Sequence, residues 1–448
     1  MQKINRLIFF PLLCSILIAL GVPAQAADTV KIGIIGPMNF IQGKGLWNGA
    51  EMAADEINAQ GGITVGKQKM KIELIKADSN EFFSIPDAAN AMEKLILRDK
   101  VDFVLGGFRS EAVLAMQDVA MDNKKLFFGL GAAHPELCLR VANDYNRYKY
   151  FFRRAPFNSS YLMKNVLAQV RSVTTELKKK LAIDRVRVAI VAEKAMWVEE
   201  MVKTSESFLP KMGMEVAGVW RPASTAKDVT AELSAIQREG AHMILTIISG
   251  PVGIPLARQA GEMKVPAVQV GINVEAAKGT FAELTQGNCN YIMTQSTYCQ
   301  GAEQNELTAP FVNNYFQRYG DIPPYTADSY SVIKYDLPPA LEKAGSLSAD
   351  TLIPILEMQN IQVPAGWARY ERDEQGRHLH DVMYGPGINT SLGIQWQDGK
   401  MVAVWPHFKW MSPYWEFSVD PPDKPNDLSY KGLKPYIIAP WVASAYKK

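Results

Sequence analysis

The sequence predicts an α/β protein made of two units in series, each a parallel sheet covered by helices. Three observations lead to this fold class. Short runs rich in β-branched residues alternate with helical patterns from about residue 30 onward. The connections between them are short, which is typical of parallel sheets with helices on both faces. The alternation starts again near residue 159, and the chain, with 48% hydrophobic residues, is too long for one hydrophobic core.

The first 26 residues have the pattern of a secretory signal peptide. Lys3 and Arg6 form a basic start, residues 7–22 are apolar, and Ala-Gln-Ala at 24–26 provides a cleavage site. The apolar stretch is shorter than the roughly 20 residues that span a bilayer. We therefore predict export and removal of residues 1–26.

The first unit begins with a buried strand that ends at Gly36-Pro37. A helix follows with small and apolar residues at helical spacing, and Gly61-Gly62 ends it. The next strand alternates polar and apolar residues, as expected when one face contacts water. We predict strands at 30–35, 71–76, 101–105 and 126–129, and helices at 46–57, 88–98 and 110–119.

The second unit repeats this alternation, beginning with a long helix. Its strands are short apolar runs, and its helices carry apolar residues on one face. We predict strands at 186–192, 215–220, 243–248 and 267–270, and helices at 159–181, 197–211, 229–238 and 254–262.

The segment 406–448 differs from both units. It is dense in Pro, Trp, Tyr and Lys and has no clear periodicity. Because exposed aromatic residues are unfavourable, we predict an extension packed over a surface; a segment that docks on a partner is the alternative.

Charge and cysteine content limit the possible functions. Beyond the signal peptide, 46 basic side chains balance 46 acidic ones, so neither nucleic acid nor an anionic membrane is expected as a partner. Cys138, Cys289 and Cys299 are odd in number, so at least one thiol is unpaired within the chain, and their pairing stays open. No spacing of Cys and His predicts a metal site, and we expect His378 and His380 in an exposed turn.

Several sequence strings together resemble the leucine/isoleucine/valine-binding protein family, the periplasmic receptors of branched-chain amino acid ABC importers. The resemblance extends over the mature chain to about residue 406. The strings are KIG at 31–33, GP at 36–37, NGAEMAADEINAQGGI at 48–63, GGFRS at 106–110, AAHPEL at 132–137, FRRAP at 152–156 and QWQDGK at 395–400.

The resemblance implies a fold of two Rossmann-like lobes, joined by three crossing strands, that close on a ligand like a Venus flytrap. The crossings are expected near 153–157, 295–300 and 364–370. The implied domains are 27–154 with 300–367 for lobe 1, 155–299 with 368–405 for lobe 2, and 406–448 packed on lobe 2.

The resemblance also implies a function: capture of a small carboxylate-bearing ligand for an ABC permease in the inner membrane. The protein is expected to be periplasmic and monomeric, without a cofactor or metal. A sensory receptor of the same fold is one alternative. An enzyme is another, although no nucleophile, acid and base appear together in a recognisable motif.

Ser110 is the first candidate ligand-binding residue. It starts a predicted helix after a strand and two glycines, and free N–H groups at a helix N-terminus attract anions. By resemblance, Ser110 contacts the ligand carboxylate, and Ala132 and Ala133 contribute a second loop. The family has a threonine where Ala133 stands, so one hydroxyl that would bind an amino-acid head group is missing.

Further candidates follow from the resemblance. Trp197 is expected at the edge of the cleft, Tyr325 at an aromatic wall, and Gln42 where the family has an aromatic residue. Asn273 or Glu275 is expected to face the cleft, and only Glu275 could pair with an ammonium group. Branched-chain and other amino acids, amides and aromatic acids all remain open as ligands.

Overall fold

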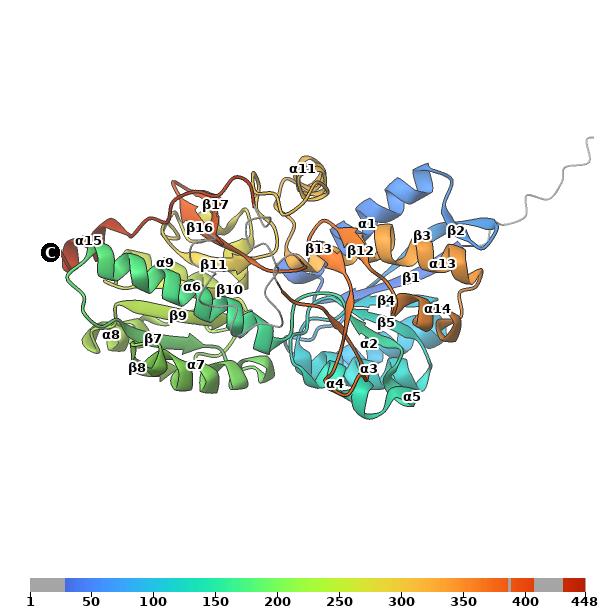
Figure 1. The fold of residues 1–448 in the computed structure, drawn as a ribbon, viewed down its shortest axis with the longest axis horizontal. Helices are drawn as coiled ribbons and strands as arrows, with labels where there is room; N and C mark the ends of the chain where they lie inside the picture. The colour runs from blue at the N-terminus through green and yellow to red at the C-terminus, as the bar shows by residue number, and fades with distance from the viewer. Residues whose placement is uncertain (1–28, 386–387, 407–429, 448) are drawn as a thin grey trace, which may run out of the picture.

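The computed structural model describes residues 29–385, 388–406 and 430–447. The predicted signal peptide at 1–26 and most of the predicted extension at 406–448 lie outside the described residues. The predicted fold class is confirmed, because two parallel sheets with covering helices lie side by side (Figure 1). We call these units lobe 1, built on the first sheet, and lobe 2, built on the second.

The sheet of lobe 1 has six strands in the order β2-β3-β1-β4-β5-β6. All neighbours pair in parallel except β2 with β3. The apolar runs read from the sequence form its centre, and Ile32, Phe103 and Phe127 are fully buried. The strands are β1 (Thr29–Gly36), β2 (Ile63–Val65), β3 (Gln68–Asp78), β4 (Phe103–Gly106), β5 (Leu126–Gly129) and β6 (Phe151–Arg153), and the helices include α1 (Ile41–Ala59), α2 (Ile85–Glu93), α3 (Ser110–Asp122) and α4 (Glu136–Asn143).

The sheet of lobe 2 has four parallel strands in the order β10-β9-β7-β8. Its two central strands are buried along their whole length apart from Arg187, as expected for a sheet covered on both faces. The strands are β7 (Arg187–Ala192), β8 (Glu215–Trp220), β9 (Met243–Ile248) and β10 (Val268–Asn273), and the helices are α6 (Ser159–Lys180), α7 (Glu199–Lys211), α8 (Thr230–Arg238) and α9 (Gly253–Glu262).

The chain passes between the lobes three times. It leaves lobe 1 after β6, returns between β11 (Met293–Ser296) and α11 (Thr308–Tyr319), and passes again before β16 (Leu392–Gln397). Strands β16 and β17 (Lys400–Trp405) form a small sheet with β11.

A hairpin of β14 (Tyr370–Arg372) and β15 (His378–Val382) precedes the third passage. Although the resemblance implies that 368–405 belong to lobe 2, this hairpin packs against α4 and β6 of lobe 1. The expectation that His378 and His380 occupy an exposed turn is wrong. Both lie on β15, and His380 is fully buried because its ring stacks on Phe152 of β6.

The described end of the chain packs on lobe 2, where Tyr436, Ala439 and Val442 join its core. The three cysteines are buried and free. Among the described residues, no helix is long and apolar enough to cross a membrane.

Candidate ligand-binding site

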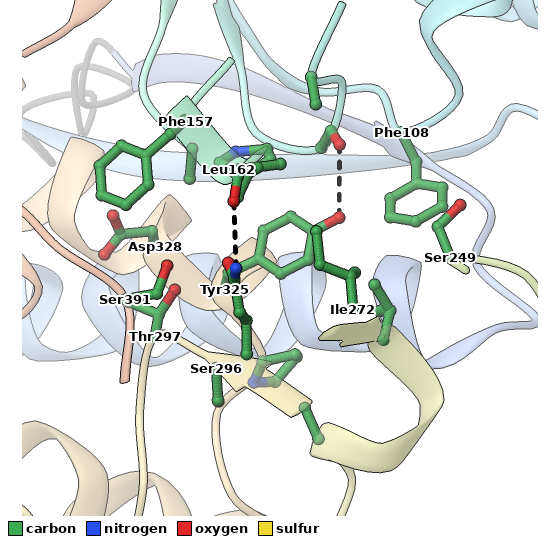
Figure 2. A pocket seen from close by; sticks show the side chains of 18 of the residues that line it. Phe108, Phe157, Leu162, Ser249, Ile272, Ser296, Thr297, Tyr325, Asp328 and Ser391 are labelled. Atoms are coloured by element: carbon green, nitrogen blue, oxygen red, sulfur yellow. Dashed lines mark hydrogen bonds between the residues drawn. The ribbon is translucent and has the colours of Figure 1, made fainter. Parts of the chain in front are cut away.

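A cavity lies between the two lobes, at the carboxyl ends of their parallel strands. Its volume is about 90 Å³, several times the roughly 10–15 Å³ that one water needs on the same measure. Ligands of open α/β sheets bind at this edge. Lobe 1 contributes Phe108, Ser110 and Ala133, and lobe 2 contributes Trp197, Ser249 and Ile272. In Figure 2, Tyr325 lies between Phe108 and Ser249 on one side and Phe157, Asp328 and Ser391 on the other.

Ser110 is the first residue of α3 and lines the cavity. The preceding turn requires glycine: Gly106 has a φ of 133°, and a Cβ there would lie 1.9 Å from the Ile35 carbonyl oxygen. The Ser110 hydroxyl accepts a hydrogen bond of 3.2 Å from the His134 amide, so its own hydrogen is available to a ligand. The position therefore combines a hydroxyl donor with the positive end of a helix dipole.

Glu81 holds the loop before α3 in place. Its carboxylate accepts hydrogen bonds from the amides of Phe108 at 2.9 Å and Arg109 at 2.5 Å, and from the Ser79 hydroxyl at 2.6 Å. Burial raises the pKa of Glu81 to about 6 although these hydrogen bonds favour its ionised form. Glu81 thus positions the loop that carries Ser110.

Trp197 lines the lobe 2 side of the cavity, just before α7. Its indole Nε1 donates to Glu193 Oε1 at 3.1 Å, and Glu193 also accepts from the Ser249 hydroxyl and from the Gly250 amide at 2.8 Å. One fully buried carboxylate therefore orients two side chains that line the cavity.

Tyr325 lines the cavity from a short helix that packs on α1. Its hydroxyl donates to the Gly131 carbonyl at 3.3 Å, and its ring stacks on Phe108 at a centroid distance of 6.4 Å. The structure thus brings Ser110, Ala133, Trp197 and Tyr325 together around one cavity.

The other four predicted site residues do not line this cavity in the described part of the chain. Ala132 turns inward, and its carbonyl accepts from Arg153 at 3.3 Å. The Asn273 amide is fully buried and donates to the Gly253 carbonyl at 3.0 Å.

Glu275 and Gln42 contact each other instead of facing the cavity. Glu275 forms an ion pair with Lys278, and Gln42 Nε2 donates to Glu275 Oε1 at 3.3 Å and to the Ser249 carbonyl at 3.2 Å. The expected ammonium partner is therefore already bound to a lysine, and Gln42 joins the lobes rather than forming a polar wall.

Sequence reasoning missed several polar cavity residues. Arg154 and Asp328 form a buried ion pair of 3.3 Å in the cavity wall. Three atoms of the lining have no hydrogen-bond partner among the described residues: Arg154 Nη2, Glu111 Oε2 and Gln295 Oε1. Ligands bind at the carboxyl ends of parallel strands, so the positions of Ser249 after β9 and of the aromatic Phe108 after β4 could have identified both as cavity residues. No local sequence pattern identifies Gln295.

Comparison with known proteins gives the family. A family model described as periplasmic binding protein matches residues 29–385. The chain belongs to the periplasmic binding protein family. This periplasmic binding protein is 24% identical over 401 residues to Leu/Ile/Val-binding protein homolog 7 of Brucella abortus, covering 86% of this chain and 93% of that protein. The family predicted from the sequence strings is confirmed.

Two solved structures have a similar fold. One is the branched-chain amino acid transporter substrate-binding protein LivJ from Streptococcus pneumoniae in complex with isoleucine. It has a TM-score of 0.67 and 18% identity, covering 85% of this chain and 100% of that chain. The other is an ABC transporter solute-binding protein from R. palustris in complex with benzoate. It has a TM-score of 0.66 and 17% identity, covering 84% of this chain and 95% of that chain.

Proposed function

We propose that this protein is the periplasmic solute-binding component of an ABC importer, and that it captures a small carboxylate by closure of its two lobes. The observation that carries the proposal is the position of Ser110, a helix N-terminal hydroxyl on a cavity formed by both lobes. A ligand shifts an opening and closing equilibrium only through contacts that are better in the closed state. Because both lobes contribute residues to this cavity, a ligand can contact both of them at once only when the lobes are closed.

An aromatic acid is the ligand class that the cavity chemistry favours. Phe108, Trp197 and Tyr325 supply aromatic surface, and Ile272 and Leu162 supply apolar surface. Such walls bind an apolar body well, while Ser110 binds a carboxylate. Neither Asn273 nor Glu275 lines the cavity to receive an ammonium group. Binding of benzoate by a protein of similar fold supports this class.

An α-amino acid is the second candidate, because one carboxylate oxygen in the cavity wall is unoccupied. Glu111 follows Ser110, and its Oε1 accepts from the Met196 amide at 2.8 Å and from Arg109 Nη2 at 3.3 Å, in an ion pair. Its Oε2 is buried and has no hydrogen-bond partner in the described structure. That oxygen can receive the ammonium group of a ligand whose carboxylate lies at Ser110.

Calorimetry with purified protein tests the proposal and separates the two classes. Benzoate and 4-hydroxybenzoate are compared with leucine, isoleucine and valine. Ser110→Ala removes a hydrogen bond to a charged group, so we expect affinity for any ligand found to fall by roughly 10- to 100-fold. The exposed Ser207 of α7 provides the control Ser207→Ala. Unchanged affinity in Ser110→Ala contradicts the assigned site.

Glu111→Gln decides between the ligand classes. Glutamine keeps Oε1 as an acceptor for Met196 but replaces Oε2 by a donor. We therefore expect loss of amino-acid binding and little change for an aromatic acid. If the wild type binds leucine tightly and Glu111→Gln does not, the α-amino acid is supported over the aromatic acid.

A further inference from the structure

Three side chains of the types that bind metal ions meet on lobe 1, and none of them lines the ligand cavity described above. They are Glu357, directly after α14 (Ala349–Leu356), and His378 and His380 on β15. One ligand atom from each lies within 4.8 Å of the other two. The sequence gives no hint of this cluster, because Glu357 is 21 residues before the first of the two histidines.

The contacts of His380 bring a ring nitrogen without a hydrogen against a carboxylate oxygen, so that two hydrogen-bond acceptors face each other. Its Nδ1 lies 2.9 Å from the Phe151 carbonyl oxygen, which can only accept, so Nδ1 carries a proton. Its Nε2 lies 2.8 Å from Glu357 Oε1, which also accepts from the Tyr145 hydroxyl at 2.7 Å. In a neutral ring, this Nε2 lone pair faces a carboxylate oxygen, and a cation, either a proton or a metal ion, is needed between them.

The surrounding groups also match a metal site. Histidine ligands of metals commonly donate their other ring N–H to a carbonyl or a carboxylate, as His380 does to Phe151. His378 Nε2 lies 3.5 Å from the second oxygen, Glu357 Oε2.

The distances fit a tetrahedral ion. Zinc bonds of 2.0–2.1 Å to nitrogen and oxygen put neighbouring tetrahedral ligands about 3.3 Å apart. The two nitrogen–oxygen distances given above, 2.8 and 3.5 Å, lie on either side of this value. The two distances involve different oxygens, so the Glu357 carboxylate must rotate to place one oxygen near both nitrogens. The three ligand atoms already lie within 4.8 Å of one another.

We propose that Glu357, His378 and His380 bind one Zn²⁺ ion, with the fourth position taken by water. Two imidazoles and a carboxylate suit zinc better than magnesium or calcium, which prefer oxygen ligands. His378 is only partly buried, so the ion can enter from solvent.

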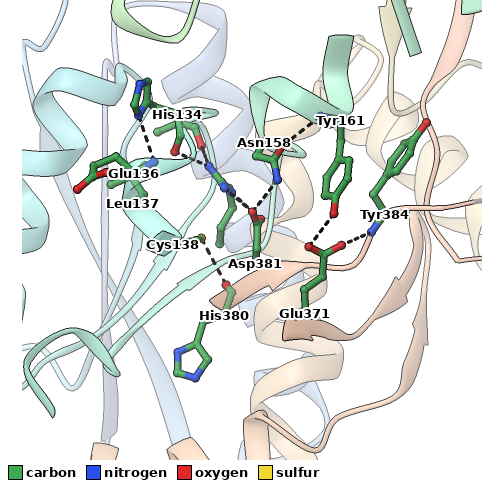
Figure 3. Close-up of polar contacts among 12 residues, drawn as sticks. His134, Glu136, Leu137, Cys138, Asn158, Tyr161, Glu371, His380, Asp381 and Tyr384 are labelled. Atoms are coloured by element: carbon green, nitrogen blue, oxygen red, sulfur yellow. Dashed lines mark hydrogen bonds and ion pairs between the residues drawn. The ribbon is translucent and has the colours of Figure 1, made fainter. Parts of the chain in front are cut away.

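The site lies beside the passage between the lobes. Asp381 follows His380 and forms a buried bidentate pair with Arg153 of β6, at 2.7 Å through Nε and 2.5 Å through Nη2. Asn158, the N-cap residue of α6 in lobe 2, donates to the same carboxylate at 2.9 Å (Figure 3). A metal ion would thus fasten the end of α14 to the strand that holds this passage.

Zinc titration of the full mature chain, purified without a histidine tag and stripped by a chelator, tests the proposal. Calorimetry should give one Zn²⁺ per chain, and zinc should raise the midpoint of thermal unfolding. His378→Asn and Glu357→Gln should each weaken zinc binding by more than about tenfold, because each removes a direct ligand. Co²⁺ in place of zinc should give visible absorption typical of tetrahedral coordination.

Matched variants control for general effects. Glu374→Gln changes an exposed acid on the same hairpin, and His242→Asn changes a histidine in lobe 2; both should bind zinc like the wild type. Circular dichroism without metal checks that each variant is folded. The proposal is overturned if zinc does not bind, or if His378→Asn and Glu357→Gln bind it as tightly as the controls. None of these outcomes depends on the organic ligand.

Discussion

Single carboxylates orient the candidate site at the residue scale. Glu193 is the strongest example, since all three of its partners are donors: the Trp197 indole, the Ser249 hydroxyl and the Gly250 amide. Two of these residues line the cavity. The Glu193 carboxylate can accept from all three donors. A glutamine side chain at this position would place its NH₂ group against at least one of them, and that hydrogen bond would be lost.

Glu193→Gln should therefore destabilise the protein and weaken ligand binding. Losing a buried hydrogen bond to a charged group costs about 1.5–3 kcal/mol, so we expect a decrease of about 2 kcal/mol in the free energy of unfolding. Urea denaturation measures the stability and calorimetry measures the affinity. The exposed Glu206 of α7 gives the control Glu206→Gln. Equal stability of both variants would show that the Glu193 charge is not required.

The hairpin β14–β15 packs on lobe 1 and accepts hydrogen bonds from the start of α6 in lobe 2. Glu371 on β14 accepts from the Tyr161 hydroxyl of α6 at 3.0 Å and from the Tyr384 amide at 3.3 Å (Figure 3). Burial, and then the nearby Asp381 carboxylate, raise the pKa of Glu371 to about 7. This group therefore titrates near neutral pH at the passage between the lobes.

The raised pKa predicts a pH dependence of stability. Because the folded protein holds this proton more tightly than the unfolded chain, the contribution is fully present below pH 4.5 and is lost as pH rises through about 7. At most about 3 kcal/mol is involved. Glu371→Gln should remove this slope and be more stable than the wild type at pH 8.

Glutamine satisfies the same partners, because the Tyr161 hydroxyl can accept where it previously donated. Chemical denaturation at pH 5, 6, 7 and 8 measures the slope, and Glu374→Gln on the same hairpin is the control. If wild type and Glu371→Gln keep parallel pH profiles, the raised pKa is refuted.

At the scale of the whole molecule, hydrogen bonds between the lobes stabilise a closed arrangement. Gln42 on α1 donates to the Ser249 carbonyl and to Glu275, both in lobe 2. The Met196 amide of lobe 2 donates to Glu111 of lobe 1 at 2.8 Å. These contacts connect the two rims of the cavity and can form only when the lobes are together.

Gln42→Ala should shift the equilibrium toward open protein. Two hydrogen bonds of about 0.5–1.5 kcal/mol each are lost, so ligand affinity should fall roughly tenfold. Small-angle X-ray scattering should give a larger radius of gyration for the ligand-free variant than for the ligand-free wild type. Gln237→Ala on the exposed face of α8 is the control. A variant with unchanged affinity and radius would mean that this contact does not hold the lobes closed.

The sequence by itself determined the elements and the family. Hydrophobic periodicity and glycine stops gave the strands and helices, and the helix expected to begin at Ser110 does so. These features depend on neighbouring residues, so a single sequence contains them. Family strings extended this to the two-lobed fold, which the family match supports.

Only the tertiary structure decided where the side chains point. Asn273 ends β10 and Glu275 follows it, where the sequence predicts a loop. Lys278 binds the Glu275 carboxylate, and the Gly253 carbonyl of α9 accepts from the Asn273 amide. Glu357 and the two histidines of β15 meet because α14 and the hairpin pack on the same lobe. Such contacts depend on how the chain packs in three dimensions, so the spacing of residues along the sequence does not predict them.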